Sequence, residues 1–426
     1  MERPNASVAD DWEFVRLDSL FEIQQGKALS PRAREGKSPR PFLRTANVFW
    51  GRVDLTNLDS MDFSDDEMEK LRLFPGDLLV CEGGDVGRTA IWRGEVRECA
   101  HQNHIHRLRA KDGDVESEFY MYWMQAAMQL LGLYGGEGNK TTIPNLSKAR
   151  LGAFAVPRPP LGEQRRIAQV LSTIQRAIEA QEKVIAAARE LKRSLMKHLF
   201  TYGPVPITET SRVPLKETEV GLVPEHWEVV ELGSQVDVKG GKRLPKGHEF
   251  AKGATPYPYI RVVDFKENSV DTSDLEFLKP EDRDAIKRYI ITSKDVYISI
   301  AGTIGLVGVV PPELDGANLT ENAARLVIRD TLRLDRGYLA LYLNSERGQS
   351  EVALRAFKTS QPKLALARIK QIPTALPPMH DQQEIAAWLE RGRKKIRCEE
   401  RRKAALQALF KTMLHHVMTA KIRVRG

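Results

Sequence analysis

Four residues in the first third of the chain have the types and the spacing of a metal site: Cys99, His101, His104 and His106. Thiolate and imidazole groups at such short intervals can bind zinc. A later segment of the chain is similar to this one, but it has Ala317, Thr320 and Ala323 near the matching places. Because the later segment lacks the ligands, polar contacts with a base or a phosphate explain the histidines better than a metal ion, and we predict no metal site.

The other motifs that resemble catalytic or cofactor sites are incomplete. Gly26-Lys27 and Gly241-Lys242 lack the earlier glycine of a phosphate-binding loop. The segment LPPM at 376–379 lacks both the polar first residue and the aromatic last residue of the loop that holds a flipped base in amino-methyltransferases. No glycine-rich loop after a strand offers an S-adenosylmethionine pocket, and no acidic pair followed by a lysine suggests a nuclease. The sequence therefore predicts no catalytic residue and no cofactor bound by this chain.

One sequence pattern occurs twice in the chain. DWEFVRLDSLFEIQQGKAL, beginning at residue 11, is repeated as HWEVVELGSQVDVKGGKRL, beginning at residue 226. FPGDLLVCEGGDVG at 74 matches TSKDVYISIAGTIG at 292, and PPLGEQRRIAQVL at 159 matches PPMHDQQEIAAWL at 377. A repeat of about 215 residues is far longer than a solenoid repeat. The duplicated part is thus a domain followed by a helix, and we expect a pseudo-twofold axis.

Each half is predicted to be an α+β domain followed by a long helix. Runs rich in β-forming residues, such as 77–81 and 295–299, accompany one apolar helix in each half, beginning at 119 and 338. That arrangement is α+β, because strands and helices do not alternate as they do in βαβ units. The expected boundaries are a first domain at 1–160, a helix at 161–202, a semi-extended linker at 203–225, a second domain at 226–380 and a second helix at 381–426.

The two helical segments carry a heptad pattern. Apolar residues recur at alternate steps of four and three along 167–199 and 385–417. Gln181, Glu399 and Lys403 interrupt the pattern, and polar residues at such positions fix the register of a coiled coil. Since a whole domain separates the helices and the repeat relates them, we expect an antiparallel coiled coil.

The basic residues are concentrated in the same two segments. Residues 163–200 hold eight Lys and Arg against four Asp and Glu, and residues 381–426 hold twelve against five, in a chain whose net charge is +8. The rest of the chain is therefore slightly acidic. The excess on the helices fits either a solvated face or a surface that meets nucleic acid or an acidic partner.

Cysteine content and hydropathy predict a cytoplasmic protein. Three scattered cysteines, at 81, 99 and 398, are too few for a disulfide framework, which favours a reducing compartment. The first residues contain neither a basic segment nor an apolar run of the kind found in signal peptides. The most apolar stretch, 296–310, is too short to span a bilayer as a helix, so we expect no membrane association.

Taken in order, several motifs resemble the specificity subunit of type I restriction-modification systems. They are a tryptophan near the start of each half, a PP-x-x-[ED]-Q-x-x-IA joint before each helix, KETEVGLVPEHW at 216–227 and VMTAKIRV at 417–424. The resemblance covers essentially the whole chain. It departs from the family pattern at Ala420, where the family usually has glycine.

This resemblance implies a DNA-binding subunit without catalytic activity. Each globular domain would be a target recognition domain that reads one half of a split target in double-stranded DNA. The paired helices would space the domains and dock modification (methyltransferase) subunits, which we expect to be two in number. S-adenosylmethionine would bind those partners. Whether restriction (endonuclease and translocase) subunits, with ATP and Mg²⁺, also join the complex stays open.

Residues that could contact DNA lie where the two halves differ. Arginine suits guanine edges, Asn and Gln suit adenine, and lysine suits phosphate. In the first half the candidates are Arg32, Arg34, Lys37, Arg40, Trp50, Arg52, Gln102, Asn103, Lys140, Thr141 and Thr142. In the second half they are Lys242, Arg243, Lys246, Tyr257, Asn318, Glu321, Asn322, Lys358, Thr359 and Ser360.

Two other classes of protein remain open from the sequence. A stand-alone DNA methyltransferase or nuclease with an unrecognised site is one, and the missing motifs argue against it. A coiled-coil adaptor that does not bind DNA is the other, and the low charge of the globular domains is its only support.

Overall fold

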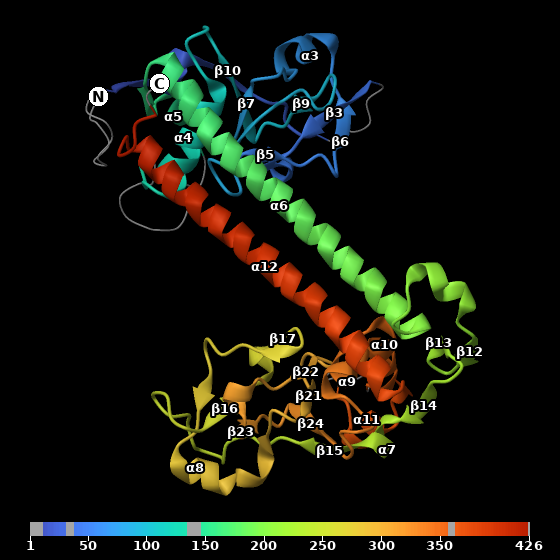
Figure 1. Cartoon of the computed structure of the whole chain (residues 1–426). Coiled ribbons are helices and arrows are strands. Elements are labelled where there is room, and N and C mark those ends of the chain that lie inside the picture. The colour runs from blue at the N-terminus through green and yellow to red at the C-terminus, as the bar shows by residue number, and fades with distance from the viewer. Residues whose placement is uncertain (1–11, 31–37, 134–145, 357–362, 425–426) are drawn as a thin grey trace. The chain divides into compact units, whose positions relative to one another are not determined.

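The computed structural model describes residues 12–30, 38–133, 146–356 and 363–424 (Figure 1). It divides into two compact units, one formed by residues 1–183 and 401–426 and the other by residues 184–400. We call them the first and the second unit. Two long helices, α6 (Leu161–Tyr202) and α12 (Met379–Met418), contribute to both units. Among the described residues, no helix is long and apolar enough to cross a membrane.

The first unit contains two small sheets. The antiparallel sheet has the order β2 (Phe21–Gln25), β10 (Ile105–Ala110), β7 (Leu78–Cys81) and β8 (Thr89–Ile91). The mixed sheet has the order β6 (Asp59–Asp62), β3 (Pro39–Leu43) and β9 (Ala100–His101), in which β3 and β9 are parallel. Strand pairs β1 (Glu13–Arg16) with β11 (Ala155–Arg158), and β4 (Val48–Phe49) with β5 (Arg52–Val53), complete the strands. The helices are α1 (Leu17–Leu20), α3 (Asp65–Leu71), α4 (Ser117–Gln129) and α5 (Lys148–Gly152).

The second unit repeats this topology, with one more strand in its mixed sheet. Its antiparallel sheet has the order β15 (Val236–Gly240), β24 (Ala323–Ile328), β21 (Val296–Ser299) and β22 (Val307–Val309). Its mixed sheet has the order β19 (Glu276–Phe277), β16 (Pro258–Ile260), β23 (Ala317–Leu319) and β20 (Ile290–Ile291), and β16 and β23 are parallel. The pairs are β14 (Glu228–Glu231) with β25 (Pro373–Leu376), and β17 (Phe265–Lys266) with β18 (Ser269–Val270). The helices are α7 (Leu232–Gln235), α8 (Pro280–Ala285), α9 (Arg336–Leu343), α10 (Glu346–Arg355) and α11 (Leu366–Lys370). The predicted duplication and α+β class are confirmed.

Within each unit α6 and α12 lie side by side and antiparallel (Figure 1). In the first unit the start of α6, including Ile167 and Leu171, shares a core with the end of α12, including Leu414 and Val417. In the second unit the end of α6 and the start of α12 share a core in the same way. Of the three polar interruptions, Gln181 and Glu399 are buried, and the partly exposed Lys403 forms an ion pair with Glu182 at 2.7 Å. The heptad pattern therefore predicted the pairing and its direction correctly.

A buried glutamine joins each long helix to its domain. Gln164 is 1% exposed; its side-chain carbonyl accepts from the backbone N–H of Glu116, the residue that caps α4, at 2.9 Å. Its amide nitrogen donates to the carbonyl of the first proline of the Pro-Pro joint at 2.8 Å. Gln382 repeats both contacts in the second unit, with the capping residue Asp335 of α9 and the matching proline carbonyl, each at 2.8 Å. One amide thus fixes the start of a long helix against a core helix.

The segment after α12 folds back onto the start of α6. Arg423 forms a two-fold ion pair with the buried Glu163, at 2.8 and 3.0 Å. Arg166 donates to the carbonyl of Val424 at 2.8 Å. The turn that allows this return is made by Ala420, whose φ is +51°. That left-handed conformation favours glycine, which explains why glycine is usual there in the family that the sequence resembles.

The segment predicted as an extended linker has more structure than expected. Residues 207–212 form a 3₁₀ helix, and β12 (Leu215–Thr218) pairs with β13 (Gly221–Pro224) as a hairpin. The strands are only four residues long and Gly221 has φ +88°, so the segment has little periodicity for sequence analysis to detect.

The conformation of Ala420 predicts an unusual effect of glycine. Replacing Ala420 with Gly should stabilise the protein by about 0.5–1 kcal/mol, because the relief of left-handed strain exceeds the entropy that glycine loses on folding. Replacing Ala404, an exposed residue inside α12, with Gly should destabilise it by a similar amount. Urea unfolding of the two variants and the parent chain would measure both changes. Equal destabilisation by the two substitutions would contradict the argument.

Candidate nucleic-acid interface

In the first unit, two candidate base-reading residues lie in a turn that is packed tightly against a glycine. A Cβ atom at Gly26 would lie 2.2 Å from the carbonyl oxygen of His101, so only glycine fits. Lys27 donates its N–H to the His101 carbonyl at 3.0 Å, and Asn103 donates its N–H to the Lys27 carbonyl at 2.9 Å. The side chains of Gln102 and Asn103 are half-buried. The Gly-Lys pair thus positions the turn through backbone contacts and does not form a phosphate-binding loop.

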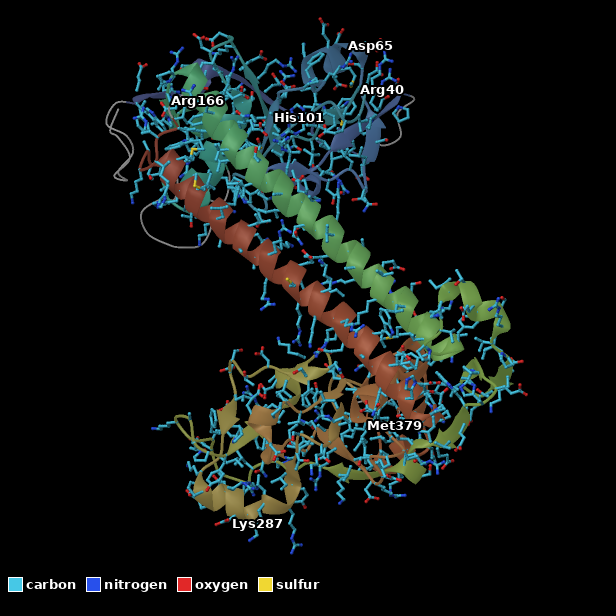
Figure 2. The ribbon with its side chains drawn as sticks, in the orientation of Figure 1. Arg40, Asp65, His101, Arg166, Lys287 and Met379 are labelled. Carbon is cyan, nitrogen blue, oxygen red and sulfur yellow. The ribbon has the colours of Figure 1, made fainter. Side chains whose placement is uncertain are left out.

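Three further candidates lie on β3 and on the hairpin of β4 and β5. Arg40, labelled in Figure 2, is half-buried and forms an ion pair with Glu98 at 3.6 Å. Trp50 is half-buried in the two-residue turn of the hairpin. Arg52 is exposed, and its guanidinium lies 4.8 Å from the centre of the Phe49 ring. Of the three, Arg52 has the side chain most available to a ligand.

The second unit has the same glycine contact with different side chains around it. A Cβ atom at Gly241 would lie 2.0 Å from the carbonyl oxygen of Thr320. Lys242 donates its N–H to Leu319 at 2.9 Å, and its side chain is exposed. Lys246 is also exposed. The loop from 241 therefore exposes two lysine side chains, and the first of them, Lys242, lies beside the turn that contains residues 320–322.

Other candidates of the second unit differ in exposure. Arg243 forms an ion pair with the half-buried Glu321 at 3.4 Å, and the adjacent Asn322 is exposed. Tyr257 is half-buried against an apolar cluster, with the guanidinium of Arg283 5.9 Å from its ring centre. Tyr257 thus contributes mainly to packing of the loop.

The expectation for Asn318 needs correction. Its side chain has no exposed surface, and its amide nitrogen donates to the carbonyl of Ile286 at 3.0 Å. The residue lies in β23, between β16 and β20, where its counterpart in the first unit is the buried Ala100. An amide enclosed in this way has no surface to offer a base, so we remove Asn318 from the candidate interface. Sequence analysis missed this because polar residues in short mixed strands carry no sign of their burial.

Nine sequence-based candidates lie outside the described residues. They are Arg32, Arg34, Lys37, Lys140, Thr141, Thr142, Lys358, Thr359 and Ser360.

The cysteine and histidine cluster is part of the core. Cys99, His101 and His106 are fully buried, and only His104 is exposed. The ring nitrogens of His101, which is labelled in Figure 2, lie 3.1 and 3.3 Å from the carbonyl oxygens of Leu71 and Gln24. Burial raises the pKa of the Cys99 thiol to about 12, which disfavours the thiolate that a metal needs.

The burial of these residues bears on both roles considered for the cluster, metal binding and contact with DNA. In the part of the chain that the structure describes, no group of three or more His, Cys, Asp and Glu side chains could hold a metal ion. The expectation that the histidines contact a base or a phosphate is wrong for His101 and His106, because neither ring reaches the surface. His104 alone retains an exposed ring beside Asn103.

Comparison with known proteins gives these surfaces a context. The sequence model of the type I restriction modification DNA specificity domain matches the chain twice, at residues 9–188 and 224–408. The chain belongs to this family. It is the specificity subunit of a type I restriction-modification system: it recognises DNA sequence, is not itself catalytic, and works with DNA and with methyltransferase or restriction subunits.

Individual relatives extend along the whole subunit. It is 24% identical to the type I restriction enzyme MjaVIII specificity subunit of Methanocaldococcus jannaschii, over 98% of this chain and 95% of that protein. It is 23% identical to the EcoBI specificity subunit of Escherichia coli, over 90% and 80%. The solved S subunit of M. genitalium has a TM-score of 0.58 at 16% identity and 98% coverage of both chains, which shows a shared fold.

Burial of His101 predicts an acid-sensitive first unit. Burial lowers the pKa of His101 to about 4, against about 6.5 for an ordinary histidine. Below pH 6.5 the unfolded chain therefore binds a proton that the folded chain refuses, and stability falls as the pH drops toward 4. At pH 5 this loss amounts to about 2 kcal/mol relative to pH 7.

Substitution by leucine, the residue at the matching position 319, tests this cause. His101→Leu should reduce the loss of unfolding free energy between pH 7 and pH 5 by about that amount, measured by urea unfolding at both pH values. His104→Leu, at the exposed neighbour, should leave the pH dependence unchanged. Parallel pH profiles for His101→Leu and the parent chain would rule out His101 as the source.

Proposed function

We propose that the two globular domains, residues 1–160 and 226–380, each read one half of a split DNA target for a methyltransferase complex. The observation that carries this proposal is one scaffold that presents two different surfaces. The turn at Gln102, Asn103 and His104 matches the turn at Thr320, Glu321 and Asn322, with different hydrogen-bonding groups at each place. Base contacts specify sequence locally, so such divergence on a common scaffold suits two unrelated half-sites.

The proposed contact residues are those whose side chains are available. In the first unit they are Arg40, Trp50, Arg52, Gln102 and Asn103, and in the second unit Lys242, Arg243, Lys246, Glu321 and Asn322. The nine candidates outside the described residues stay proposals on sequence alone. Exposed lysines suit phosphate contacts, which position the protein, while Asn322 suits an adenine edge.

We further propose that two modification subunits dock on the long helices, one on each copy of a repeated apolar face. Ala187 and Leu191 are exposed on α6, and Ala405 and Leu409, 218 residues later in each case, are exposed on α12. Leu191 is 69% exposed and Leu409 is 47% exposed, although the facing residues of both helices are buried in the coiled coil. Because the same face occurs twice, it suits two copies of one partner.

The proposal that methylation requires separate modification subunits can be tested directly. The purified chain, mixed with target DNA and S-adenosylmethionine, should transfer no methyl group, and addition of the modification subunits should produce methylation of one split sequence. Sequencing of methylated bases in DNA treated with each mixture would report the activity and the target together. Robust methylation by the chain alone would refute the proposal in favour of an enzyme. A complex that methylates DNA without sequence preference would support an adaptor instead.

The number of modification subunits in the complex tests the proposed docking face on each long helix. Leu191→Asp and Leu409→Asp should each leave a complex with one modification subunit, because a buried charge at an interface centre costs about 2 kcal/mol or more. The double variant should bind none. Native mass spectrometry would count the subunits, and Leu332→Asp, at a leucine that is 85% exposed but lies off the helices, is the control. Two bound subunits in the double variant would exclude this face.

A further inference from the structure

A fully buried carboxylate lies beneath the basic loop of the second unit. Asp282, the third residue of α8, has no exposed surface. Lys287, labelled in Figure 2, lies in the turn that follows this helix. Oδ2 of Asp282 has no hydrogen-bond partner among the described residues, and Oδ1 contacts Nδ1 of His248. A buried carboxylate is costly unless a cation or donor compensates it, so Asp282 depends on His248.

His248 belongs to the loop that carries the proposed phosphate contacts. The loop leaves β15 at Gly241, exposes Lys242 and Lys246, and returns to the domain where Ala251 donates its N–H to Phe277 at 2.8 Å. His248 is about half exposed, with 48% of its side chain accessible, while its ring contacts the buried acid. It therefore holds the later part of the loop to the body of the domain, as the Arg243–Glu321 ion pair holds the earlier part.

The corresponding helix of the first unit carries a different pair of a carboxylate and a cation. On α3, Glu67 binds Nζ of Lys27 at 2.6 Å, but its side chain is 37% exposed, whereas Asp282 on α8 is fully buried. Lys27 also donates to the carbonyl of Asp62 at 2.7 Å, so its ammonium group is committed within the domain. Its counterpart Lys242 makes the same backbone contact but has an exposed side chain. In the second unit His248 contacts the buried acid of the helix, and the side chain of Lys242 is exposed.

We propose that the His248–Asp282 pair positions the loop 241–252 so that the exposed Lys242 and Lys246 contact the phosphate backbone of the second half-site. The inference rests on the proposed reading role of the second domain. A loop held in place before DNA arrives loses less conformational entropy on binding, which is how a residue without DNA contact strengthens affinity. His248 and Asp282 are thus positioning residues.

The test uses the complex of the full chain with its modification subunits and its target DNA. Asp282→Asn and His248→Ala should each speed amide hydrogen exchange in residues 242–250 and weaken binding to the intact target by about tenfold. The double variant should be no worse than either single one, because both remove one contact. His248→Lys should keep exchange slow and affinity close to that of the parent chain, since an ammonium group can also pair with the Asp282 carboxylate. If Asp282→Asn fails to fold, His248→Ala, at a half-exposed side chain, still provides the test.

Binding to DNA in which one half-site is scrambled shows which half-site each variant affects. Each weakening variant should lose affinity for the intact target and for the target whose first half is scrambled, but not for the target whose second half is scrambled. Glu67→Gln, in the first unit, is the matched control. It should lose affinity for the intact target and for the target whose second half is scrambled, but not for the target whose first half is scrambled. Unchanged exchange in both weakening variants, or additive effects in the double variant, would overturn the pair as a positioning contact. Faster exchange with unchanged affinity, together with no effect of Lys242→Ala, would instead overturn the proposed DNA contact of this loop.

Discussion

The buried glutamine at the start of each long helix is the contact on which the arrangement of each unit depends. Gln164 and Gln382 are almost completely enclosed, and each connects the cap of a core helix with the Pro-Pro joint. Loss of such an amide would leave several backbone groups unpaired, each at a cost of about 1–3 kcal/mol. The long helix cannot tilt against its domain without breaking these bonds, so the coiled coil and the domain behave as one body within each unit.

Around this fixed joint the two units keep their backbone contacts and change their side chains. The close approach of Gly26 to the turn at 101–103 recurs at Gly241 and the turn at 319–321, down to the same N–H donation by the following lysine. Side chains on these turns are free to differ because backbone atoms make the contacts that hold them. A duplicated scaffold of this kind lets sequence preference change in one half without altering the fold of either.

The sequence predicted the parts of the structure that depend on periodicity and repetition. The duplication, the two helices and their antiparallel pairing follow from patterns that extend over tens of residues. Burial of single polar residues did not follow, as Asn318 and His101 show, because neither residue type nor spacing distinguishes an enclosed amide or imidazole from an exposed one. The hairpin at 215–224 was missed because two four-residue strands carry too little alternation. Ala420 was noticed only as a departure from a family pattern, and its positive φ supplies the physical reason.

The candidate interface was harder to predict because the two units share a backbone arrangement but differ in the side-chain contacts built on it. An alignment of the two halves pairs Lys27 with Lys242 and suggests one role for both. In the structure Lys27 is bound by Glu67 and the carbonyl of Asp62, whereas in the second unit His248, from the loop between β15 and β16, contacts Asp282. The role of each lysine therefore depends on which side chain pairs with the carboxylate of the adjacent helix. This difference in the partners of the two lysines is not apparent from either half alone. It emerges when the side-chain contacts of the two units are compared.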